Sequence, residues 1–63
     1  MKLDDFDAAI SLDPNYDDAY YYRGRSYETL GNLQKAEADY NRVLELGLSN
    51  TLMELAEGRL VNL

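Results

Sequence analysis

The feature that most constrains how this 63-residue chain can fold is its similarity to itself at a shift of 34 residues. The residues aligned by that shift are Asp5 with Asp39, Phe6 with Tyr40, Ala9 with Val43, Ile10 with Leu44, Leu12 with Leu46, Gly24 with Gly58, and Arg25 with Arg59. The two groups of matches lie in different parts of the chain yet share one period, so chance explains them poorly. A fixed period of this length indicates structural units that stack and bury a common core.

Apolar residues recur at three- and four-residue steps along most of the chain, which predicts α-helices. We expect one helix before Pro14, a second over about 16–30, a third over 33–46 and a fourth from about residue 51. The linkers are so short that consecutive helices must be antiparallel neighbours. Strands are a poor alternative, because the tyrosines at 20–22 have neither alternation nor a hairpin turn around them. The sequence therefore predicts an all-α fold of about four helices.

Local signals mark the ends of these helices. Proline disfavours helical geometry in the residue before it, so Pro14 ends the first helix. Gly31 can take the left-handed conformation that closes a helix, and Asn32 is a favoured N-cap for the next one. Thr51 and Glu54 fit a capping box, which predicts that the fourth helix begins near Thr51.

The composition limits the chemistry available to the chain. It contains no cysteine, histidine or tryptophan, which excludes thiol and imidazole catalysis, a disulfide framework and a conventional zinc site. Its serines have no histidine to activate them. We therefore expect no enzymatic activity and no cofactor.

The charge is strongly acidic. Twelve acidic residues against six basic ones give a net charge of −6, so nucleic acid and anionic membranes are poor partners. The first 22 residues hold six aspartates against Lys2 alone, a balance of −5, which favours a basic partner there, although a solvated acidic face is the simpler reading. No signal-peptide pattern or membrane-length apolar run is visible, and a cytoplasmic location is the default expectation.

A calcium-binding loop is the one metal motif that the sequence suggests. Asp13, Asn15 and Asp17 have the spacing of the first ligands of such a loop. The pattern then fails twice, because Asp18 stands where a glycine is needed and Gly24 stands where a bidentate glutamate is needed. We expect no metal site.

The residues at the repeat positions resemble the tetratricopeptide repeat family, whose helix-turn-helix unit has a period of 34 residues. The residues that carry the resemblance are Tyr20, Gly24 and Tyr27 on the first helix of the unit, and Ala36, Tyr40 and Val43 on the second. Within residues 17–50 two positions depart from the family pattern: Arg23 replaces an apolar residue, and Leu48 replaces the closing proline. In residues 51–63, Glu54 and Glu57 stand where large apolar residues are expected. The resemblance implies a right-handed superhelix of antiparallel helix pairs, with residues 1–63 forming a single domain.

The physical role of these residues can be argued without the family. Gly24 and Ala36 are small, which lets the two helices of a pair approach closely, and the tyrosines fill the space around that contact. Arg23 must lay its aliphatic stem along the core and carry its charge to water or to an acid.

The resemblance assigns different parts of the repeat to different segments. Residues 17–50 resemble one complete repeat, residues 1–16 the second helix of a preceding repeat, and residues 51–63 the first helix of a following or capping repeat. Such arrays need about three repeats for stability. We therefore expect a part of a longer array or a minimal engineered unit.

The resemblance also implies a protein–protein interaction module that holds a peptide in a concave groove. The residues that would face this groove are Asp18, Tyr21, Tyr22, Arg25, Glu28 and Thr29. Exposed tyrosines are good contact residues, but one of the adjacent pair could instead pack against residues 1–12. Arg25 is the only basic residue among the six, so a clamp for a C-terminal carboxylate is not expected. A ligand of basic or aromatic character fits better.

Self-association is the alternative function. The two ends resemble complementary halves of a repeat, and chains could complete each other as a dimer, ring or filament. The apolar residues that would meet are Leu3, Phe6 and Ile10 at one end and Leu52, Leu55, Leu60 and Leu63 at the other. The simpler reading is a monomer in which the last helix folds back as a cap.

Overall fold

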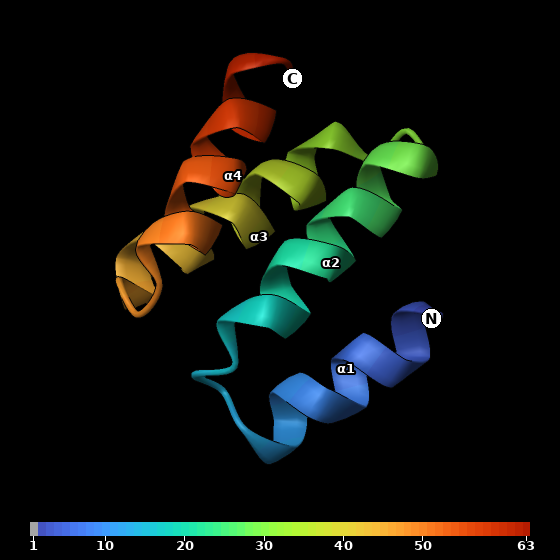
Figure 1. Cartoon of the computed structure of the whole chain (residues 1–63). Helices are drawn as coiled ribbons and strands as arrows, with labels where there is room; N and C mark the ends of the chain where they lie inside the picture. The colour runs from blue at the N-terminus through green and yellow to red at the C-terminus, as the bar shows by residue number, and fades with distance from the viewer. Residues whose placement is uncertain (1) are drawn as a thin grey trace.

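Four α-helices make up the described part of the chain, residues 2–63 of a computed structural model (Figure 1). They are α1 (Leu3–Leu12), α2 (Asp17–Thr29), α3 (Leu33–Leu46) and α4 (Asn50–Val61). These described residues contain no strand, and the prediction of an all-α fold is confirmed.

The turn between α2 and α3 forms as its sequence predicts. Gly31 has a φ of 80°, in the left-handed region that glycine enters at little cost. The Asn32 side chain caps α3 by accepting a hydrogen bond from the backbone N–H of Lys35 at 3.3 Å. Gly47, at a φ of 59°, closes α3 in the same way.

The fourth helix begins earlier than the sequence pattern indicates. Its N-cap is Ser49, whose hydroxyl accepts a hydrogen bond from the backbone N–H of Leu52 at 3.3 Å. The expected capping box of Thr51 and Glu54 is therefore wrong, and both residues lie inside α4. Serine and threonine are both favoured caps, and the earlier one gives a longer helix.

The helices pack in the order in which they follow one another. α2 and α3 form the central antiparallel pair, α4 lies against both of them, and α1 lies against α2 (Figure 1). The buried cluster between α2, α3 and α4 consists of Tyr20, Tyr21, Ala36, Tyr40, Val43, Leu52 and Ala56. Leu30 and Leu33 continue the apolar stripes in the sequence, yet both are exposed because they flank the turn at Gly31.

No helix within residues 2–63 is both long enough and apolar enough to cross a bilayer.

Candidate partner-binding groove

The contact between α2 and α3 depends on one glycine. A Cβ atom placed on Gly24 would lie 2.8 Å from Cε1 of Tyr40, which is closer than real carbon atoms approach. Tyr40 and Ala36 are both fully buried at this contact. Gly24 therefore allows the close approach that its place in the repeat predicts.

Arg23 joins three helices through its guanidinium group. On α3, it donates to both carboxylate oxygens of Asp39, at 2.9 and 2.7 Å, and on α1 it donates to Asp7 Oδ1 at 2.9 Å. The rings of Tyr20 and Tyr27 lie 5.7 and 5.9 Å from the guanidinium carbon. The paired carboxylates raise the pKa of Arg23, Asp39 most strongly. Of the two expected destinations for this charge, water or an acid, the structure shows the acids.

Asp39 is a buried charged residue that the sequence pattern did not single out. Only 5% of its side chain is exposed, and Arg23 satisfies it. Two signals could have identified it. Asp39 lies on the apolar stripe of α3 between Ala36 and Val43, and Arg23 occupies a core position that requires a partner.

A second polar network links α2 to α3 and α4. Arg59 donates to the two carboxylate oxygens of Glu28 at 3.0 and 2.8 Å, and the hydroxyl of Tyr40 donates to Glu28 Oε1. The bidentate arginine is the main reason that the pKa of Glu28 lies below its ordinary value. Burial, assisted by Glu28, raises the pKa of Tyr40. The network fixes where α4 sits on α2.

The six residues predicted to face a partner divide into two groups. Asp18, Tyr22, Arg25 and Thr29 are exposed and follow one side of α2. Tyr21 is only 5% exposed and packs its ring 5.7 Å from that of Tyr40, and Glu28 is held by Arg59.

Three neighbouring hollows lie between α1 and α2 and share lining residues, and together we call them the α1–α2 groove. The first, of about 300 Å³, is lined by Phe6, Ala9, Tyr16, Asp18, Ala19 and Tyr22. The second, of about 230 Å³, is lined by Phe6, Tyr22, Arg25, Ser26 and Thr29. The third, of about 430 Å³, is lined by Lys2, Leu3, Asp4, Ser26, Thr29 and Leu30. All four exposed members of the predicted set therefore line this groove.

An aromatic pair lies where the first two hollows meet. The ring centroids of Phe6 and Tyr22 are 6.5 Å apart, and their planes are inclined by only 16°. Phe6 is buried, whereas Tyr22 is 47% exposed. Tyr22 therefore offers an amphipathic surface in the middle of the groove.

Comparison with known proteins gives the family. Residues 17–47 match the family model of the tetratricopeptide repeat. The chain belongs to the tetratricopeptide repeat family. Members of this family mediate protein–protein interaction.

Two curated proteins show similarity over most of this tetratricopeptide repeat chain. It is 35% identical, over 49 residues, to serine/threonine-protein phosphatase T of Trypanosoma brucei brucei. It is 46% identical, over 46 residues, to RNA polymerase II-associated protein 3 of Xenopus tropicalis. These matches cover 78% and 73% of the chain but only 10% and 7% of the two relatives. No solved structure gives a significant match.

Some of the apolar residues expected to join two chains are instead buried within a single chain. Phe6 and Leu52 are buried, and Leu55 is 48% exposed on α4. The remaining four, Leu3, Ile10, Leu60 and Leu63, are partly buried.

The candidate calcium loop forms an ordinary turn. Asp13 accepts a hydrogen bond from the backbone N–H of Asn15 at 3.0 Å, and Pro14 accepts one from the hydroxyl of Tyr20 at 2.9 Å. Within residues 2–63, no group of three acidic side chains is placed to hold a metal ion.

Proposed function

We propose that this tetratricopeptide repeat chain is a protein-interaction module that binds a partner segment in the α1–α2 groove. The observation that carries the proposal is the coincidence of two independent results. Four of the six residues predicted from the repeat positions to contact a partner line hollows on the folded surface, namely Asp18, Tyr22, Arg25 and Thr29.

The chemistry of the groove suits protein recognition. Tyrosine and arginine are the residues that most often dominate binding energy at interfaces, and here Tyr22 and Arg25 stand side by side in the second hollow. Tyr22 loses little conformational freedom on binding, since its ring already stacks on Phe6.

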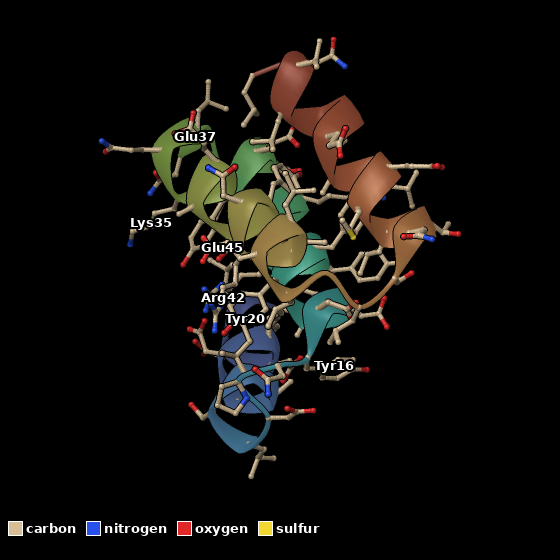
Figure 2. The ribbon with its side chains drawn as sticks, turned by 90° about the vertical axis from the view of Figure 1, so that its left-hand side faces the viewer. Tyr16, Tyr20, Lys35, Glu37, Arg42 and Glu45 are labelled. Carbon is tan, nitrogen blue, oxygen red and sulfur yellow. The ribbon has the colours of Figure 1, made fainter. Side chains whose placement is uncertain are left out.

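A peptide selection tests this proposal. Peptides selected from a random library against the whole chain are measured by titration calorimetry on the parent and on Arg25→Ala. We expect Arg25→Ala to weaken binding about tenfold, as for an interface hot spot. Glu37→Ala, on the outer face of α3 (Figure 2), is the matched control and should leave binding unchanged. Equal weakening by both variants, or by neither, would overturn the proposal.

Self-association is a second candidate, supported by the open surface of α4. Nothing lies within 4 Å of a Cβ placed on Gly58, whereas its equivalent Gly24 is covered by Tyr40. We propose that α4 of one chain could pack against α1 of another. Light scattering across a concentration series tests this: a mass that stays at 7.2 kDa contradicts it, and a mass that rises to a defined multiple supports it.

A further inference from the structure

One side chain of α2 connects the two helices that flank it in the sequence. α1 and α3 each pack against α2, but within residues 2–63 they do not pack against each other (Figure 1). Arg23 of α2 donates hydrogen bonds to both, to Asp7 on α1 and to Asp39 on α3. Among the described residues, the bond to Asp7 is the only hydrogen bond that joins α1 to another helix. The guanidinium group of Arg23 is therefore the link between α1 and α3.

This guanidinium group is held in one orientation by α2 and α3. Its Nε and Nη2 atoms both donate to Asp39, at 2.9 and 2.7 Å, and such a fork fixes the plane of the group. The rings of Tyr20 and Tyr27, about one turn to either side on α2, lie 5.7 and 5.9 Å from its central carbon. The remaining nitrogen, Nη1, donates to Asp7 Oδ1 at 2.9 Å. Because the fork is fixed, the direction in which Nη1 points toward α1 is fixed as well.

The two carboxylates differ in their exposure to solvent. The side chain of Asp39 is 5% exposed, whereas that of Asp7 is 53% exposed. Salt therefore screens the contact with Asp7 much more than the buried contact. Raising the ionic strength should weaken the hold on α1 while Arg23 stays bound to Asp39.

The apolar contact of α1 lies next to the ionic one. Phe6 is the buried residue of α1, and its ring stacks on that of Tyr22. Phe6 and Asp7 are consecutive on α1, as Tyr22 and Arg23 are on α2. Consecutive helical residues point about 100° apart, so the two contacts hold α1 on two different sides. When the ionic contact is lost, the Phe6 contact remains as a pivot about which α1 can turn.

We propose that Asp7 and Arg23 form an ionic latch that sets the angle of α1 against the α2–α3 pair. Loss of the latch gives α1 a second orientation and leaves α2, α3 and α4 packed on one another. The family pattern has an apolar residue in place of Arg23, and an apolar contact has no preferred direction. Arg23 replaces it with a directional contact that responds to charge. The latch acts whether or not a partner occupies the α1–α2 groove.

Distances between α1 and α3 test the latch on the full chain. The chain contains no cysteine, so Ala8→Cys and Ala38→Cys, at exposed sites on α1 and α3, place one spin label on each helix. Pulsed electron paramagnetic resonance then gives the distribution of distances between the two labels. We expect one narrow distribution at about 0.1 M salt and a second, shifted distance at about 1 M, where electrostatic interactions extend over only about 3 Å.

Asp7→Lys should give the second distance already at low salt, because the new ammonium group repels the guanidinium group. Its matched control is Asp4→Lys, which makes the same charge change on α1 at a residue that takes part in none of the ion pairs among residues 2–63. This control should keep the parent distance. Arg23→Lys should also give the second distance, because lysine keeps the charge but lacks the fork that aims Nη1.

Two outcomes would overturn the proposal. A single unchanged distance in Asp7→Lys at both salt concentrations would show that α1 keeps its angle without the latch. A second distance in Asp4→Lys as well would show that the charge of α1 as a whole is responsible. Far-UV circular dichroism checks the helix content of each variant. If Asp7→Lys loses helix, Asp7→Asn decides in its place, because it removes the charge at nearly unchanged helix propensity.

Discussion

At the scale of single residues, the Arg23–Asp39 pair shows how a charge is tolerated in a small core. Asp39 is 5% exposed and Arg23 is 21% exposed, and their two hydrogen bonds satisfy both groups. The aromatic rings on either side shield the pair from water and favour the cation. Removing one partner alone leaves an uncompensated charge, whereas removing both does not.

Arg23→Leu should therefore lower the free energy of unfolding by about 2–3 kcal/mol, somewhat less than for a fully buried pair because Arg23 retains some contact with water. The double variant Arg23→Leu, Asp39→Leu should return to within about 1 kcal/mol of the parent, since apolar residues can replace the pair. Urea unfolding followed by circular dichroism measures both. A double variant no more stable than the single one would contradict this explanation.

The same scale shows a limit of sequence reasoning. The sequence indicated that Arg23 carries its charge to water or to an acid, but it did not indicate which acid. Asp7 and Asp39 both pair with Arg23, and only packing places Asp39 in the core. Likewise, helical spacing does not decide which of Tyr21 and Tyr22 turns inward. The position of α3 decides it, because the ring of Tyr21 packs near Tyr40.

At the scale of helices, the distance between α2 and α3 is set by Gly24 and the ring of Tyr40. That ring cannot move easily, because it is fully buried and its hydroxyl is bound to Glu28. The equivalent glycine on α4, Gly58, faces open space. One substitution at two equivalent positions should therefore have opposite effects.

Gly24→Ala should destabilise the chain by about 1–3 kcal/mol, as expected for overpacking. Gly58→Ala should stabilise it by about 0.5–1 kcal/mol, because alanine is the better helix former and meets no neighbour. The midpoints of urea unfolding provide the comparison. Shifts of the same sign for both variants would contradict the proposed packing.

The attachment of α4 depends on pH through Glu28. Its pKa lies below the ordinary value of 4.5 in the folded chain, mainly because of Arg59. The unfolded chain therefore binds this proton at a higher pH than the folded chain does. The stability that the ionised group contributes is present above about pH 4.5 and is lost as the pH falls through the lower folded pKa.

Glu28→Gln should be less stable than the parent by about 0.5–1 kcal/mol at pH 7, because Arg59 is 42% exposed and the pair is partly screened. The difference should narrow as the pH falls below 4.5. Thermal melts between pH 7 and pH 3 test this, with Glu37→Gln as a control for the loss of one charge. A difference that stays constant over this range would show that the ion pair does not anchor α4.

The sequence predicts a helix end correctly where only one strong capping residue is present. Gly31 and Asn32 have no competitor nearby, and both act as expected. Two favoured caps lie close together before α4, and the local pattern could not choose Ser49 over Thr51. The choice depends on where Leu52 must lie to reach the core, which is a tertiary constraint.

At the scale of the whole molecule, the repeat period predicted the fold and also organises its surface. The period makes the α1–α2 groove equivalent to the surface of α3 and α4 against which α2 packs. It could not predict that Glu28 is unavailable to a partner, because that depends on Arg59 reaching across from α4. Four of the six predicted contact residues remain available on the surface.

The acidic charge of the molecule should affect how fast a partner binds. With a net charge of −6, the chain attracts peptides of net positive charge, and this attraction acts mainly on the association rate. For such a selected peptide, raising the salt concentration should slow association much more than it changes dissociation. Stopped-flow measurements at two salt concentrations test this, and an association rate independent of salt would contradict it.

The most direct test of the central claim is a map of amide chemical shifts when a selected peptide is added to the ¹⁵N-labelled chain. If the α1–α2 groove is the binding surface, the largest shifts should cluster at Phe6, Asp18, Tyr22, Arg25 and Thr29. The outer face of α3 around Lys35 and Glu37 should stay unchanged (Figure 2). Shifts centred on that outer face, or on α4, would show that the partner binds elsewhere and would contradict the claim.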